Sequence, residues 1–301
     1  MTTVSTSKIK IAALLSALLI FCGCSDGDSE NCRRVAVLTA PVGAIVRTVA
    51  GSGVEVSVIV PPGKDAHEYE PSPGDLRGLQ HGGVYLSLGM RSELRLADAV
   101  AGSGGKVRML APELERLPFE EHDHDGGHDE HETDAAEFGD PHVWMSPENC
   151  AVIAESCGEI LADTYPELAA EFRANAEKYA ADMRALSTRI AAELAPYRGK
   201  EFYVFHPAFG YFARDFGLIQ RAVEPAGKDP SPRELEAVLA AARASRVTVL
   251  YTGTQFNPSL PAAAAGMLGC RLEMIDPLPV DPTANFIDLT AKLKLGFAEI
   301  K

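Results

Sequence analysis

The sequence has too few basic residues for a nucleic-acid-binding protein. Of its 301 residues, 28 are Lys or Arg and 42 are Asp or Glu, which gives a formal net charge of −14. Ten of the acids lie within residues 120–140, a stretch that contains no Lys or Arg. Proteins that bind nucleic acid carry a basic patch or stripe, and this chain shows none. We therefore expect no nucleic-acid partner.

Cysteine is also scarce, and none of the six cysteines forms the close C-x-x-C pair of a zinc–thiolate site. Cys150 and Cys157 stand seven residues apart on an expected helix. Their Cα atoms would then be about 10 Å apart, too far for a disulfide with each other. Two interpretations stay open for Cys32, Cys150, Cys157 and Cys270: small buried side chains, or one long-range disulfide.

The chain lacks an apolar run long enough for a stable membrane-spanning helix. The run Ile11–Phe21 follows two lysines and is too short to span a bilayer. This layout is typical of a secretory signal, which we place at residues 1–23. The small residue before Cys24 resembles a bacterial lipoprotein cleavage site, where the cysteine is lipidated. We expect residues 24–33 to be a lipidated tether, with a plain cleaved signal peptide as the alternative.

After this segment, short apolar runs alternate with amphipathic segments. The apolar runs predict strands and the amphipathic segments predict helices, and their alternation favours parallel α/β sheets. In such sheets, ligand loops lie beyond the carboxyl ends of the strands. We expect strands at 34–39, 54–60, 84–88, 107–110, 202–205, 247–251 and 271–275, and helices at 42–50, 72–80, 148–162, 234–244 and 261–268.

One amphipathic segment is long and lies in the middle of the chain. No Gly or Pro occurs between Pro166 and Pro196. An unbroken helix of this length would extend for about 40 Å, enough to join two lobes. The expected organisation is an N-terminal α/β lobe at 34–165 with a disordered insertion at 118–140, a linking helix at 166–196, and a C-terminal α/β lobe at 197–301.

Four phrases place a metal-binding side chain in an expected loop. His67 follows the second expected strand, His142 follows Asp140-Pro141, and His206 and Asp276 each end a strand. Three imidazoles and one carboxylate suit a transition metal. A single loop histidine is usually only a polar residue, but four such phrases divided between two lobes predict one metal site.

These phrases, in this order around a long helix, resemble the zinc/manganese receptors of bacterial ABC metal importers, whose two lobes are joined by one rigid helix. The likeness covers nearly all of the mature chain. It implies a monomeric, exported receptor, lipid-anchored through Cys24, that delivers metal to a permease and its ATPase. The matching phrases are Pro61–Pro71, Asp140–Trp144, His206–Phe212 and Asp276–Leu278, and the implied ligands are His67, His142, His206 and Asp276.

Two positions depart from the resembled family. The phrase Gly253-Thr254-Gln255-Phe256 stands where the family often has Glu-Pro-Gln-Phe. Ala66 stands where some zinc receptors carry an acid before the first histidine, which favours Asp276, or water, as the fourth ligand. Two interpretations stay open for Glu68 and Glu70: acids that orient an imidazole, or solvated loop residues.

The donor set favours Zn²⁺. Imidazole suits zinc, whereas carboxylate-rich donor sets suit manganese. Manganese members of the resembled family tend to place a carboxylate where this chain has His206. A manganese or iron receptor of the same type is the alternative.

A second group of histidines lies among the acids of residues 120–137. Histidine-rich tracts bind metals readily but weakly, and such tracts occur in zinc members of the resembled family. We expect an auxiliary metal-binding loop, with a merely solvated loop as the alternative. Its histidines are His122, His124, His128 and His131.

Two other function classes compete with a receptor. A secreted zinc hydrolase also uses three protein ligands, with a water at the fourth position. The sequence lacks an H-E-x-x-H helix pair, and Asp276 would fill the position of the reactive water. We therefore expect no enzymatic activity. An adhesin or extracellular metal buffer is the third class, and it differs from an importer's receptor in needing no permease.

Overall fold

The computed structural model describes residues 33–67, 69–72, 74, 83–118, 138–224 and 231–299. The chain divides at Arg33, and the fold described here is that of the unit Arg33–Lys301. The expected signal peptide, the tether with Cys24, most of the expected helix at 72–80 and the four histidines of the acidic tract lie outside the described residues. None of the described helices is long and apolar enough to cross a bilayer.

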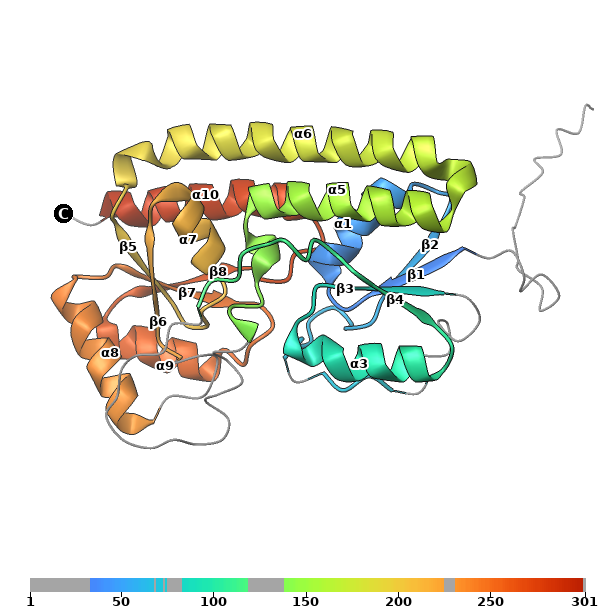
Figure 1. Cartoon of the computed structure of the whole chain (residues 1–301). Coiled ribbons are helices and arrows are strands. Elements are labelled where there is room, and N and C mark those ends of the chain that lie inside the picture. Colours follow the sequence, from blue (N-terminus) through green and yellow to red (C-terminus); the bar gives the residue numbers. More distant parts are fainter. Residues whose placement is uncertain are drawn as a thin grey trace, which may run out of the picture. The chain divides into compact units, whose positions relative to one another are not determined.

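Two four-stranded sheets form the centres of two lobes within this unit (Figure 1). Every described strand pair is parallel, and the strand orders are β2-β1-β3-β4 and β6-β5-β7-β8. The predicted α/β class with two parallel-sheet lobes is confirmed. The strands are β1 Arg34–Val37, β2 Glu55–Val58, β3 Val84–Ser87 and β4 Lys106–Met109 in the first sheet, and β5 Glu201–Val204, β6 Ile219–Ala222, β7 Val249–Gly253 and β8 Arg271–Ile275 in the second.

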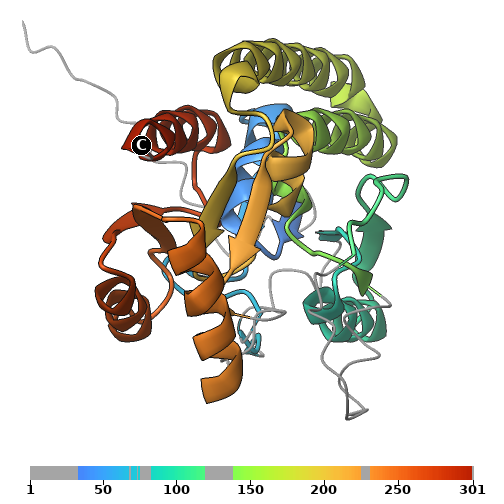
Figure 2. The same cartoon turned by 90° about the vertical axis from the view of Figure 1, so that its left-hand side faces the viewer.

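Helices cover both faces of the sheets, which explains why the inner strands are apolar. All residues of β3 and β7 are buried, as expected of parallel strands packed on both sides. Figures 1 and 2 show α1, α5, α6, α7 and α10 on one side of the sheets and α3, α8 and α9 on the other. The helices are α1 Ala40–Ala50, α3 Arg91–Gly102, η1 Val143–Met145, α5 Pro147–Thr164, η2 Pro166–Leu168, α6 Ala169–Leu194, η3 Ala195–Tyr197, α7 Gly210–Phe216, α8 Pro232–Ala244, α9 Ser259–Leu268 and α10 Pro282–Glu299.

The long helix α6 joins the two lobes, as the sequence predicts (Figure 1). Its 26 residues correspond to about 39 Å of helix. It packs on α5 and α1 in one lobe and on α10 in the other. Gly158 lets α5 approach α6 closely, because a Cβ at this position would lie 2.7 Å from the Cβ of Ala176. The buried residues of α6 form one stripe and are Phe172, Ala176, Ala180, Met183, Leu186, Ile190 and Leu194.

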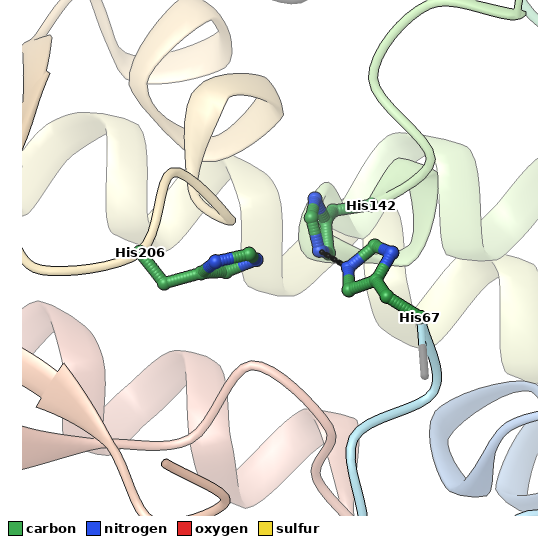
Figure 3. A group of neighbouring side chains, drawn as sticks. All are labelled: His67, His142 and His206. Atoms are coloured by element: carbon green, nitrogen blue, oxygen red, sulfur yellow. Dashed lines mark hydrogen bonds between the residues drawn. The ribbon is translucent and has the colours of Figure 1, made fainter. Parts of the chain in front are cut away.

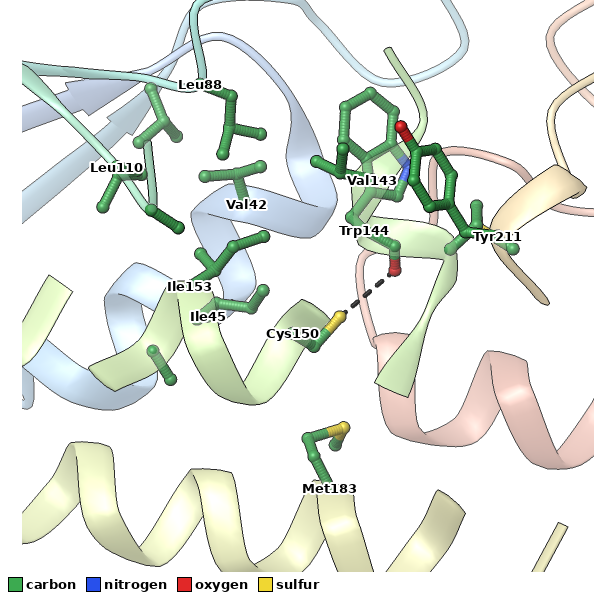
Figure 4. Packing of buried hydrophobic residues seen from close by; sticks show 14 of the residues in the cluster. Val42, Ile45, Leu88, Leu110, Val143, Trp144, Cys150, Ile153, Met183 and Tyr211 are labelled. Carbon is green, nitrogen blue, oxygen red and sulfur yellow. Dashed lines mark hydrogen bonds between the residues drawn. The ribbon is translucent and has the colours of Figure 1, made fainter. Parts of the chain in front are cut away.

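The buried cluster beside the candidate site contains Trp144 and the cysteines of α5 (Figure 4). The Cys150 thiol donates to the Trp144 carbonyl at 3.1 Å. Burial raises the pKa of the Cys150 and Cys157 thiols, which makes them unreactive packing groups. Cys150, Cys157 and Cys270 are all free, so the interpretation as small buried side chains holds for Cys150 and Cys157, whereas Cys270 is only half-buried.

Candidate metal centre

Three loops bring His67, His142 and His206 together (Figure 3). His67 lies in the loop after β2, His142 directly precedes η1, and His206 lies two residues beyond the end of β5. One ring nitrogen from each histidine lies within 4.8 Å of the others. Two of the residues come from the first lobe and one from the second, so the cluster spans both lobes.

The spacing of the rings suits a single small ion. The Nε2 atoms of His67 and His142 are 3.1 Å apart, and the three ring centroids are separated by 5.1 to 5.4 Å. Nitrogens bound at about 2.0–2.1 Å to a tetrahedral zinc ion lie about 3.3 Å from each other. The first pair is therefore already near the separation that a shared zinc ion requires.

A buried carboxylate orients the His142 ring. Asp140 Oδ1 accepts from the backbone N–H of His142 at 2.8 Å and from its Nδ1 at 2.8 Å. Both residues are buried. This hydrogen bond assigns the proton to Nδ1 and leaves the Nε2 lone pair facing the other histidines. A neutral ring in this tautomer is a metal ligand.

The His206 ring is held in the same way by Glu224. Its Nδ1 donates to Glu224 Oε2 at 2.9 Å, and both residues are buried. The ring also packs on Phe256, with a centroid separation of 4.7 Å. His206 Nε2 is buried and has no hydrogen-bond partner among the described residues. A buried polar atom left without a partner is costly, and a metal ion at the centre of the cluster would satisfy it.

The rings of His67 and His206 are neutral over the physiological range. Burial, followed by the charges of His142 and His206, lowers the pKa of His67 to about 3. Burial, followed by the charge of His142, lowers the pKa of His206 to about 3. Zinc binds the deprotonated imidazole, so few protons have to be displaced from these two rings. His67 differs from the other two histidines because the residue as a whole is exposed and forms the rim of the cluster, whereas its ring is enclosed where it packs against the His142 and His206 rings.

The fourth expected ligand, Asp276, is not part of this close group. Its Oδ1 accepts from Gln255 Nε2 at 2.6 Å and from the Leu278 backbone N–H at 2.9 Å. With Gln255 it lines a cavity of about 130 Å³ that is also lined by Pro61–Lys64, the segment just before His67. Asp276 thus shares a cavity with the segment that leads to His67, but its carboxylate is bonded elsewhere, and its role as a ligand stays a prediction.

The acids that orient the rings are Asp140 and Glu224, which the sequence analysis did not select for this role. Glu68 lies outside the described residues. Asp140 could have been found from its place two residues before His142. The contact between Glu224 and His206 follows from the register of two strands. Val204 of β5 pairs with Ala222 of β6, and His206 and Glu224 each follow two residues later. Because β6 was not predicted, this juxtaposition was not available from the sequence.

Known proteins share both the sequence and the fold. The family model of ZnuA, zinc-uptake complex component A, periplasmic, matches residues 35–293. The zinc-binding lipoprotein AdcA of Streptococcus pneumoniae is 28% identical over 280 residues, covering 89% of this chain and 55% of AdcA. The high-affinity zinc uptake system protein ZnuA of Brucella abortus is 30% identical over 302 residues, covering 88% of this chain and 89% of that protein.

A solved structure also matches. The crystal structure of a ZnuA deletion mutant with zinc bound has a TM-score of 0.78 to this chain at 26% identity, over 88% of this chain and 98% of that one. The chain spans about half the length of the AdcA relatives.

Proposed function

Because this chain belongs to the family of periplasmic zinc-uptake complex component A proteins, we propose that it is an extracytoplasmic receptor for Zn²⁺. It captures the ion with high affinity and delivers it to the permease of an ABC importer, which works with an ATPase. The observation that carries this proposal is the buried Nε2 of His206, which no group in the described part of the chain hydrogen-bonds and which faces the ring nitrogens of His67 and His142.

The donor chemistry supports zinc as the cargo. Three neutral imidazoles suit zinc better than manganese, which prefers carboxylate-rich sites. Two of the rings are fixed by carboxylates, which raises their basicity and orients their lone pairs. Asp276 would complete a tetrahedral donor set. Among the described residues the close donor group contains the three histidines and not Asp276, so its carboxylate must turn, or its loop shift, when the ion binds.

Competition titration of metal-free protein against a zinc chelator tests this proposal. We expect one tight Zn²⁺ per chain and much weaker Mn²⁺ binding. His206→Ala should bind zinc at least 100-fold more weakly, since truncation removes a ligand. His81→Ala, which changes a histidine outside the four ligand phrases, is the matched control and should bind normally. Unchanged zinc affinity in His206→Ala would refute the assignment.

We also propose that the site is not catalytic. A zinc hydrolase needs a metal-bound water and a nearby general base. Asp140 and Glu224, the carboxylates bonded to the ligand rings, are each occupied by a ring Nδ1. Each carboxylate therefore lies behind its ring, on the side away from the Nε2 that would bind the ion, and is not placed to take a proton from a metal-bound water. The zinc-loaded protein should therefore hydrolyse an activated ester no faster than free zinc does, and faster hydrolysis would favour an enzyme.

Membrane anchoring and a weak auxiliary site complete the proposal. Cys24 would carry the lipid that holds the receptor at the outer face of a membrane, beside the permease. The histidines of the acidic tract would bind further ions weakly, since ordering a polar segment around a metal costs conformational entropy. The high negative charge of the tract would still concentrate zinc nearby, an effect that weakens as salt concentration rises.

A further inference from the structure

We propose that Tyr211 is a positioning residue for the metal centre, which holds Asp140 in place and so fixes the His142 ring. This inference rests on the proposed zinc-binding function. Tyr211 lies on α7, in the second lobe, five residues after His206, whereas Asp140 and His142 belong to the first lobe. The tyrosine thus connects the loops of two ligands that are far apart in the sequence.

The Tyr211 hydroxyl makes two hydrogen bonds to the first lobe. It donates to the Asp140 carbonyl at 2.7 Å and accepts from the Leu117 backbone N–H at 3.1 Å. Asp140 N–H in turn donates to the Leu117 carbonyl at 2.7 Å. Tyr211 is fully buried beside the Trp144 segment (Figure 4), so its hydroxyl is shielded from bulk solvent. The three bonds form a closed ring that fixes the backbone of Asp140.

The fixed backbone of Asp140 determines where its carboxylate lies. That carboxylate accepts from His142 Nδ1, and the bond selects the tautomer whose Nε2 lone pair faces the ion. Movement of Asp140 by a few tenths of an ångström would lengthen the bond and let the ring turn. Tyr211 therefore acts on the metal through Asp140 and does not touch the ion itself.

A glycine at the start of α7 supports the same arrangement. A Cβ built on Gly210 would lie 3.0 Å from Asp140 Oδ2. The carboxylate therefore packs directly on the backbone of α7, in a space that any side chain would narrow. The preceding residue is also fixed, because the Phe209 N–H donates to the buried Gln220 at 2.7 Å. The second lobe thus holds Asp140 from two sides.

Zinc affinity of Tyr211→Phe, measured by chelator competition on the full chain, tests the proposal. Loss of a partner that orients a ligand costs about 10–100-fold in metal affinity, and we expect about tenfold here because Tyr211 acts one bond further away. The matched control is Tyr251→Phe, which removes another buried hydroxyl that donates to a carbonyl, that of Lys292 at 3.1 Å. It should leave zinc affinity unchanged.

A double-mutant cycle separates positioning from general loss of structure. If Tyr211 acts through Asp140, then Tyr211→Phe in an Asp140→Ala background should weaken zinc binding by less than twofold. The visible spectrum of bound Co²⁺ should also change in Tyr211→Phe and not in Tyr251→Phe. Wild-type zinc affinity in Tyr211→Phe, or additive effects of the two substitutions, would overturn the inference.

A second variant keeps the test decisive if Tyr211→Phe does not fold. Gly210→Ala adds one methyl group against Asp140 and should also weaken zinc binding. Gly266→Ala is its control, because a Cβ at that position would meet no described atom within 4 Å beyond its chain neighbours and its own turn of helix. Normal zinc affinity in Gly210→Ala would refute the proposed packing. If the wild-type protein binds no zinc tightly, both this inference and the receptor function fail, whereas tight wild-type binding with unaffected variants overturns this inference alone.

Discussion

Replacement of Glu224 should weaken zinc binding, and the size of the loss can be calculated from the strength of its hydrogen bond to His206. Glu224 Oε2 accepts from His206 Nδ1 at 2.9 Å in a buried environment. Glu224→Gln keeps the shape and an acceptor oxygen but removes the charge. Hydrogen bonds to charged groups contribute about 1.5–3 kcal/mol and neutral ones about 0.5–1.5 kcal/mol. The difference of about 1–1.5 kcal/mol corresponds to about 5–12-fold weaker zinc binding.

Glu224→Ala should have the larger effect. It leaves the Nδ1–H of His206 without an acceptor, and the free ring can then move its proton to Nε2, which blocks the metal. The expected loss lies near the upper end of the range for such partners, about 100-fold. Chelator competition at constant pH measures both variants. The control is Glu159→Gln, which removes an exposed carboxylate paired with Arg173 on the protein surface. Equal losses in all three variants, or none, would refute the reasoning.

Four further predictions follow from the same features. Burial of their rings lowers the pKa of His67 and His206 to about 3, below the ordinary value of 6.5. Between these two values the unfolded chain binds more protons than the folded chain, so the metal-free fold should lose stability as pH falls from 6.5 towards 3. Urea unfolding that is unchanged between pH 7 and pH 4 would contradict this. The continuous helix Ala169–Leu194 has no hinge, so scattering profiles with and without zinc should nearly superimpose, and a large change in radius of gyration would argue for hinge closure. Deletion of Glu120–Glu137 should remove only weak zinc equivalents in calorimetry, and loss of the tight site would place ligands in the tract. Detergent-phase partitioning should depend on Cys24, and the anchor prediction fails if Cys24→Ala and the wild type are equally soluble.

Much of the fold could be predicted because the buried strands are apolar on both faces. The element β3 and the long helix α6 follow directly from an apolar run and from an uninterrupted amphipathic stripe. Elements with polar residues on their buried side could not be found in this way. In β6 the buried Gln220 interrupts the apolar pattern, and in α3 the buried Glu93 does the same. Their polar groups are satisfied by tertiary contacts, such as the bonds of Glu93 to Ser87 and Met90, which a local pattern does not contain.

The same distinction applies to the candidate site: some of its residues can be predicted from the local sequence, and others depend on tertiary contacts. The histidine cluster could be predicted because each histidine lies in a loop phrase, and such loops gather beyond the carboxyl ends of parallel strands. The carboxylates that orient the rings could not, because Glu224 reaches His206 only through the register of β5 and β6. The position of Asp276 depends on its bond to Gln255, a side chain in a different loop.

The cross-lobe contacts define which part of the site is formed before metal arrives. His142 and His206 are buried, each is held by a carboxylate, and Tyr211 bonds to the chain beside His142. A further bond between the lobes runs from Trp144 Nε1 to the Pro277 carbonyl at 2.8 Å. These two rings form a preformed half-site, which reduces the ordering cost of binding.

His67 and Asp276 are not part of this preformed half-site. This difference between the ligands affects how the ion is released. His67 is exposed at the rim, and Asp276 is bonded to Gln255 and Leu278. A receptor has to hold zinc tightly and still give it up to a permease. Disturbing the buried rings would require breaking their carboxylate bonds and the contacts between the lobes. Withdrawal of the His67 ring from its place at the rim breaks one metal bond without opening the core, so we expect release to begin at His67.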